Sequence, residues 1–407
     1  MSFKLYRNLS HAMMFGCLSF IASGAYASNN LLMADYSVTV LPSNSSMYPG
    51  ESMFNANGYP SLVKFVKGDS KKPLVVFIPG NLHLGRISYG FPGGNDKDFL
   101  AYWLNKEGYS FLSISYPLEH PVYPGDYSQF TLEDFGKQVA QITQYYIQQE
   151  KLNNRVIVLL WSGAGRSIVN INREMKNSKI NLDFAVSLDA SPPLMGINAT
   201  NTPNVSGKFP INASGYLDKN VLTTFTMDQV HGENKLNGKV IIPDNIYESQ
   251  FMASSPVQFY NNFIKYNGSK LVTDESGMLK NNYYQNFADY PLVAVIHDDD
   301  QLDAFHVVLD SSNWNFINEQ ALYSKYLNLS YEHLTNKQWL GLQSIYASIP
   351  SALTRVIHGN HWFFIGENGA RQTAQAIQEE EQSVHKIKQE LTNPAYNNDE
   401  GIFTRIK

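Results

Sequence analysis

Short apolar runs alternate with amphipathic helical patterns along most of this chain, and that alternation constrains its fold more than any other feature. The runs are continuous rather than alternating, as in residues 74–78 (LVVFI) and 156–160 (VIVLL). Strands of this kind are buried on both faces, because helices cover each side of a mostly parallel sheet. The sequence therefore predicts an α/β fold.

Six such runs are predicted to be core strands, with helices between them. They cover residues 74–78, 111–115, 156–160, 184–188, 292–296 and 353–357. The helical pattern is clearest after Thr131, where apolar residues recur at helical spacing from Leu132 onward. Asp134 can complete a capping box with Thr131. A further helical pattern over residues 370–387 is expected to close the fold.

The rhythm of strands and helices breaks in two places, and these breaks define the predicted organisation. Residues 28–195 form the first part of the core, and residues 196–290 are rich in Asn, Ser, Tyr and Gly with little periodicity. We expect the latter to be an inserted cap. Residues 291–407 then complete the core, with a second insertion at about 304–350.

The first 27 residues have the pattern of an export signal. Lys4 and Arg7 precede an apolar run over residues 12–22, and Ala25 and Ala27 supply the small side chains that a signal peptidase reads. The run is too short for a membrane span, which takes about 20 apolar residues. We expect cleavage after Ala27, a secreted or periplasmic protein, and no membrane span in the mature chain.

Composition excludes several kinds of site and partner. Cys17 is the only cysteine, so cleavage after Ala27 leaves no thiol for disulfides, catalysis or metal binding. A lipoprotein signal at Cys17 is the alternative, disfavoured by the bulky Phe15. The formal charge of −5, without a basic cluster, gives no basis for a nucleic-acid partner. No zinc-ligand spacing or phosphate loop is present, so no metal or cofactor is expected, and the oligomeric state stays open.

Ser162 lies where a predicted buried strand turns at once into a helix through Gly163, Ala164 and Gly165. A serine on such a turn is exposed at the carboxyl edge of the sheet, beside the free amides of the new helix. The segment resembles the nucleophile elbow of the α/β-hydrolase superfamily, with Leu160 where that pattern has a small residue. We expect the helix side of the turn to make room for it.

The alternative for Ser162 is a plain helix N-cap, the position where serine is favoured in any case. Ser167, one helical turn later, is a second candidate nucleophile. Trp161, beside Ser162, is expected either to form an aromatic wall of a pocket or to pack against the cap.

The resemblance also supplies the partners of Ser162. The superfamily carries its catalytic histidine in the loop after the last strand, which points to His361, with His358 as the alternative. Its acid most often follows the preceding strand. There the resemblance implies Asp300, with Asp299 next.

Other positions for the acid and for the oxyanion hole follow from the same resemblance. Asp303 lies in the same acidic run as Asp300, and Asp189 ends an earlier predicted strand. The backbone amides of Asn81, or failing it Leu82, and of Gly163 would stabilise a developing oxyanion.

The expected function is that of an exported serine hydrolase with a Ser-His-Asp triad and an acyl-enzyme intermediate. A Tyr-rich, weakly charged insertion favours an ester of an apolar or aromatic small molecule, or of a lipid, as the substrate. The alternative is a non-catalytic binding protein that keeps the α/β-hydrolase fold.

Overall fold

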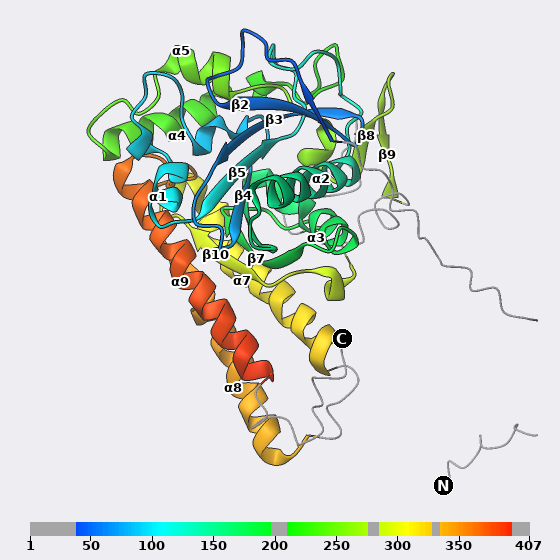
Figure 1. The fold of residues 1–407 in the computed structure, drawn as a ribbon, viewed down its shortest axis with the longest axis vertical. Helices are drawn as coiled ribbons and strands as arrows, with labels where there is room; N and C mark the ends of the chain where they lie inside the picture. The colour runs from blue at the N-terminus through cyan, green and yellow to red at the C-terminus, as the bar shows by residue number, and fades with distance from the viewer. Residues whose placement is uncertain (1–37, 197–209, 276–284, 328–333, 393–407) are drawn as a thin grey trace, which may run out of the picture. The chain divides into compact units, whose positions relative to one another are not determined.

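A nine-stranded sheet forms the core of the computed structural model, which describes residues 38–196, 210–275, 285–327 and 334–392. Over these residues the strand order is β1-β2-β3-β5-β4-β6-β7-β10-β11 (Figure 1). The strands are β1 (Thr39–Leu41), β2 (Glu51–Ala56), β3 (Tyr59–Val66), β4 (Leu74–Ile78), β5 (Ser110–Ser115), β6 (Arg155–Trp161), β7 (Asn181–Leu188), β10 (Val293–His297) and β11 (Thr354–Val356).

The sheet is parallel from β5 to β11 and antiparallel only at its β1-β2-β3 end. The six predicted strands correspond to β4, β5, β6, β7, β10 and β11. The apolar runs of β4, β5, β6, β7 and β10 are buried because side chains on both faces pack against helices, as at Val75 and Val76 of β4, whereas the edge strand β11 is only partly buried. The predicted α/β class is confirmed.

Helices cover both faces of the sheet (Figure 1). One face packs against α2 (Leu132–Glu150), α3 (Ile168–Asn177) and α7 (Ala304–Leu322), and the other against α1 (Leu100–Lys106), α8 (Asn336–Ala352) and α9 (Glu367–Thr392). The capping box predicted at Thr131 is present, because its hydroxyl accepts from the Asp134 amide while the Asp134 carboxylate accepts from the Thr131 amide.

The described part of residues 196–290 contributes α4 (Thr223–Leu236), α5 (Asp244–Ile246) and the hairpin β8 (Ile264–Tyr266) to β9 (Leu271–Thr273). Its designation as a cap stays a prediction. The second predicted insertion, 304–350, also stays a prediction, although α7 within it packs against the core. Trp314 of α7 is fully buried and donates through Nε1 to the Ala190 carbonyl oxygen at 2.7 Å. The aromatic residues of this segment are therefore partly core residues.

Parallel strands bring their carboxyl ends to one edge of the sheet, where the connecting loops can meet. The turns after β4, β6, β7, β10 and β11 all lie at this edge and carry the predicted site residues. Within the described ranges, no helix has the length and apolar character that crossing a membrane requires.

Candidate active site

Ser162 follows the last residue of β6 and has a left-handed backbone, with φ of 55°. A non-glycine residue rarely adopts this conformation, and such strain is typical of functional turns. Gly80, at the end of the β4 segment, approaches the turn so closely that a Cβ there would lie 2.7 Å from the Ser162 Cβ. The turn therefore presents the serine hydroxyl beside the loop after β4.

The helix side of this turn is built around small residues, as the sequence predicted. Residues Ser162–Ser167 form a 3-10 turn before α3 begins, and Leu160 is fully buried in the core. Gly165 has no room for a side chain, because a Cβ would lie 2.4 Å from the Ser191 carbonyl oxygen. Ser167 is buried and donates to the Ala164 carbonyl oxygen at 2.7 Å, so it is bonded within the turn and absent from the pocket lining.

His361 lies in the loop after β11 and pairs with Asp303, not with Asp300. Its Nδ1 is 2.7 Å from Asp303 Oδ2, and the two side chains are 5% and 7% exposed. Asp300 instead caps the 3-10 turn Gln301–Asp303, accepting from the Leu302 amide at 2.8 Å. This turn carries Asp303 round to the histidine, which a strand pattern alone does not reveal.

The alternative histidine forms a separate pair at the surface. His358 Nδ1 lies 3.0 Å from Asp299 Oδ1, and the His358 side chain is 72% exposed. It is not among the residues that line the pocket. The structure therefore brings together Ser162, His361 and Asp303, and leaves His358 and Asp299 outside.

Two more carboxylates lie behind His361. Asp189 Oδ2 is 3.8 Å from His361 Nδ1, and oxygen atoms of Asp189, Asp298 and Asp303 cluster within 4.8 Å of one another. Burial raises the pKa of Asp298 to about 8 and that of Asp189 well above its usual value, and the charge of Asp303 adds to both shifts. Burial would also raise the pKa of Asp303, but the charge and hydrogen bond of His361 lower it. Asp303 is thus the ionised partner.

Helix α4 holds the histidine loop in place, a contact that was not predicted from the sequence. Asn360 donates its backbone amide to Glu233 Oε1 at 2.9 Å and its side-chain amide to the Gln229 carbonyl oxygen at 2.8 Å. The His361 amide donates to Gln229 Oε1 at 3.3 Å. Gln229 and Glu233 are four residues apart on α4 and therefore share one face of the helix. This spacing is the one sequence signal that could have grouped the two side chains.

The residues predicted to form an oxyanion hole lie in the loop after β4 and in the turn after β6. The Tyr116 hydroxyl donates to the Gly80 carbonyl oxygen at 2.7 Å, and it is also hydrogen-bonded to the Leu82 amide. Because the Gly80–Asn81 peptide is trans, the Asn81 N–H points away from that carbonyl. Asn81, Leu82 and Gly163 all line the pocket, but the Leu82 amide is already bonded to Tyr116, so Asn81 is better placed than Leu82 as the second donor.

His83 fixes the Asn81 peptide from its other side. The ring Nδ1 lies 2.7 Å from the Asn81 carbonyl oxygen, and Nε2 lies 2.7 Å from the Tyr247 hydroxyl. Burial lowers the pKa of His83 to about 4. The neutral ring therefore donates through Nδ1 and accepts from Tyr247 through Nε2.

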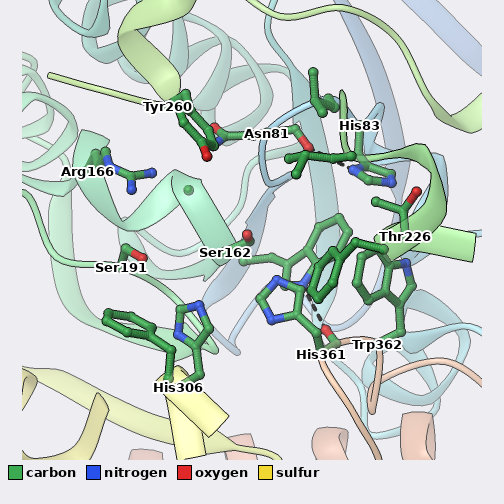
Figure 2. A pocket seen from close by; sticks show the side chains of 16 residues that line it. Asn81, His83, Ser162, Arg166, Ser191, Thr226, Tyr260, His306, His361 and Trp362 are labelled. Carbon is green, nitrogen blue, oxygen red and sulfur yellow. Dashed lines mark hydrogen bonds between the residues drawn. The ribbon is translucent and has the colours of Figure 1, made fainter. Parts of the chain in front are cut away.

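These groups surround a cavity of about 310 Å³, which matches a small ligand. Figure 2 shows Ser162 near its middle, with His361 and Trp362 on one side and Arg166, Ser191 and Tyr260 on the other. Among the described residues, the structure records no hydrogen bond between the Ser162 hydroxyl and the His361 ring. Trp161 forms part of the aromatic wall, because its ring lies 5.7 Å from that of His361.

Besides His83 and His361, His306 of α7 lines the same cavity. Its Nδ1 is 2.9 Å from Asp310 Oδ2, and its ring centroid is 5.0 Å from that of His361. Possible ligand atoms of Asp303, His306 and His361 lie within 4.8 Å of one another, a donor set that could hold a metal ion. Since Asp303 and His361 are already hydrogen-bonded to each other, a metal would have to displace that bond.

No family model and no curated protein matches the chain. Similar solved structures include a carboxylesterase of Nitrososphaera gargenis, 13% identical, covering 86% of this chain and 99% of that chain with a TM-score of 0.41. Another is a soluble variant of monoglyceride lipase from Saccharomyces cerevisiae. It is 11% identical, and the match covers 84% of this chain and 95% of the lipase with a TM-score of 0.44. A thioesterase domain from the curacin biosynthetic pathway is 11% identical. The match covers 81% of this chain and 98% of that domain, with a TM-score of 0.38.

These likenesses are weak, whereas the chain's own geometry is specific. The sheet is parallel where it carries the site, Ser162 occupies a left-handed turn after a central strand, and an aspartate and a histidine follow the last two strands. The strand arrangement, the elbow and the chain order Ser, Asp, His give this protein the α/β-hydrolase fold.

Proposed function

We propose that this chain is a serine hydrolase that cleaves carboxylic esters. The observation that carries the proposal is the buried His361, which bonds to Asp303 through Nδ1 and lines the same cavity as Ser162. A buried imidazole oriented by a carboxylate beside a strained serine is the arrangement that activates a hydroxyl. Asp303 takes the role that the sequence analysis gave to Asp300.

In this mechanism the Ser162 hydroxyl turns toward Nε2 of His361, gives up its proton there and attacks the ester carbonyl carbon. Asp303 stabilises the imidazolium that forms. The amides of Asn81 and Gly163 donate to the oxyanion of the tetrahedral intermediate. His361 then protonates the leaving alkoxide, which departs as the alcohol. A water molecule repeats the sequence on the acyl-enzyme, releasing the acid and restoring the Ser162 hydroxyl.

The test is Ser162→Ala compared with Ser167→Ala, assayed on short-chain aryl esters. Ser162→Ala should remove turnover to the background rate while the circular dichroism spectrum stays that of the wild type. Ser167→Ala should keep turnover, since that hydroxyl is bonded inside the turn. Ester hydrolysis that survives in folded Ser162→Ala would sink the proposal, and no hydrolysis by the wild type would favour a binding protein.

We also propose that the chain is exported and cleaved after Ala27. Lys4, Arg7, the apolar run 12–22 and Ala25 support this proposal, and these residues lie outside those that the structure describes. Expression of the full chain in a host with a secretory pathway, followed by N-terminal sequencing of the exported product, tests it. A first residue of Ser28 is expected, and an intact Met1 terminus retained inside the cell would contradict export.

A further inference from the structure

A second strained residue lies in the loop after β4. Leu82 has a left-handed backbone, with φ of 65°, and its side chain is buried. A bulky residue adopts this conformation only where the surrounding structure holds it there, and such positions cluster at active sites. Leu82 separates Asn81, the proposed second donor of the oxyanion hole, from His83. The groups that hold this loop therefore also bear on the direction of the Asn81 amide.

The predicted cap forms a short backbone ladder with this loop. The Ala253 amide donates to the Leu82 carbonyl oxygen at 2.8 Å, and the Leu84 amide donates to the Phe251 carbonyl oxygen at 2.9 Å. All four residues are buried, so water does not compete for these bonds. The two bonds flank His83, and they fix the loop directly after its left-handed residue.

His83 adds a side-chain bond that reaches back to Asn81 (Figure 2). Its Nδ1 lies 2.7 Å from the Asn81 carbonyl oxygen, which can only accept, so Nδ1 carries a proton. Burial lowers the pKa of His83 to about 4, so the ring is neutral at neutral pH and Nε2 is an acceptor. The hydroxyl of Tyr247, 2.7 Å from Nε2, is the donor that this tautomer needs. Tyr247 is fully buried and, like the ladder, belongs to the predicted cap.

We propose that His83 and Tyr247 are positioning residues of the oxyanion hole, with the Tyr247 hydroxyl fixing the His83 tautomer that holds the Asn81 peptide. The Tyr116 bond to the Gly80 carbonyl fixes the peptide before Asn81, and the His83 bond fixes the peptide after it. Together the two bonds set the direction of the Asn81 N–H. Donors held in this way stabilise an oxyanion well, because they need not reorient during the reaction. This inference rests on the proposed function, since the oxyanion forms only in that reaction.

The kinetic test removes one hydroxyl from each of two buried tyrosines. Tyr247→Phe should lower kcat on an aryl ester by about 10-fold and leave KM within about twofold, because the oxyanion donor acts in the transition state. Tyr109→Phe is the matched control, because the buried Tyr109 donates to Glu381 Oε2 at 2.7 Å and does not line the cavity. This variant should keep the wild-type kcat. Unchanged kcat in Tyr247→Phe, or equal losses in both variants, would overturn the role of Tyr247.

Two replacements of His83 test the hydrogen bond to Asn81. His83→Leu removes the donor and should lower kcat by about 100-fold, the size typical of a lost oxyanion donor. His83→Asn can place its side-chain amide where Nδ1 lies, so it should recover part of this loss. A role in packing alone would instead favour leucine, which fills the buried space better. A kcat for His83→Leu equal to or above that of His83→Asn would therefore overturn the inference.

Nitrogen-15 NMR of the histidine side chains separates this inference from the proposed function. In the wild type at pH 7 we expect His83, assigned through its backbone resonances, to be neutral with its proton on Nδ1. That tautomer without hydrolysis of any ester would overturn the proposed function and the oxyanion role with it, while the hydrogen-bonded arrangement of His83 would stand. Ester hydrolysis by a wild type whose His83 is cationic or protonated on Nε2 would overturn the inference alone, even if no variant folds.

Discussion

Two histidine–aspartate pairs lie on the same two loops of this protein. Their N–O distances are similar, but their burial differs. His361 lies 2.7 Å from Asp303, and His358 lies 3.0 Å from Asp299. In the first pair both side chains are almost fully buried, whereas those of His358 and Asp299 are 72% and 45% exposed. Adjacent loops after parallel strands readily place such pairs together, so pairing alone does not identify a catalytic histidine.

The surroundings separate the two pairs. His361 lines the cavity that contains Ser162, and α4 covers its loop through Gln229 and Glu233. The exposed pair is screened by water and contributes little. In the buried pair the hydrogen bond to Asp303 holds the imidazole in one orientation away from bulk solvent, as a general base requires.

The largest expected effect contrasts the two histidines. His361→Ala should lower kcat by about a million-fold, to the level that remains without a general base. His358→Ala should stay within about twofold of the wild type, because its ring is exposed and outside the cavity. Steady-state rates on an aryl ester measure both. Equal losses in the two variants would erase the distinction drawn between the pairs.

The next effect contrasts the two aspartates. Asp303→Asn should lower kcat by about ten-thousand-fold, since the amide would favour the wrong tautomer of His361. Asp299→Asn removes only the surface contact with His358 and should retain the wild-type rate. If Asp303→Asn keeps most of its activity, Asp189, 3.8 Å from the same Nδ1, is the acid instead.

A smaller effect, on the free energy of unfolding, tests the contact that Glu233 of α4 makes with the histidine loop. Burial raises the pKa of Glu233 from 4.5 to about 7. Between pH 4.5 and 7 the unfolded chain releases the Glu233 proton, whereas the folded chain keeps it. The proton bound to Glu233 therefore stabilises the folded state fully below pH 4.5, and this stabilisation is lost as the pH rises through 7. From pH 5 to 8 the wild type should lose about 2.5 kcal/mol more free energy of unfolding than Glu233→Gln.

Glu233→Gln keeps an acceptor for the Asn360 amide, so the comparison isolates the charge. Urea titrations at both pH values give the free energies, and Glu107→Gln, at an exposed position, is the control that should follow the wild type. A Glu233→Gln variant with the same pH dependence as the wild type would mean that Glu233 is ionised in the folded protein.

The sequence predicted the features that depend on local pattern. Continuous apolar runs located the core strands, and the small residues after Ser162 located the elbow. The place of His361 after the last strand could be predicted, because a loop after the last strand is a defined place in the chain. These features follow from the neighbours of each residue along the sequence, which is why a pattern suffices.

Features that depend on contacts across the fold could not be predicted this way. Asp300 was predicted to pair with His361, but a 3-10 turn that the apolar pattern does not reveal brings Asp303 to the histidine instead. Residues 304–350 were predicted to be an insertion because their helical pattern is mixed, and that pattern does not reveal that Trp314 anchors α7 to the core. The hydrogen bond from the Asn360 amide to Glu233 joins positions 127 residues apart, so no local pattern indicates it.

The most direct test of the account is labelling of the protein by a fluorophosphonate, with peptide mapping of the modified residue. A serine reacts rapidly only when a base removes its proton. We predict a single label on Ser162 in the wild type and in His358→Ala, and none in folded His361→Ala. Label elsewhere, or unchanged labelling of Ser162 without His361, would contradict the claim that the buried pair activates this serine.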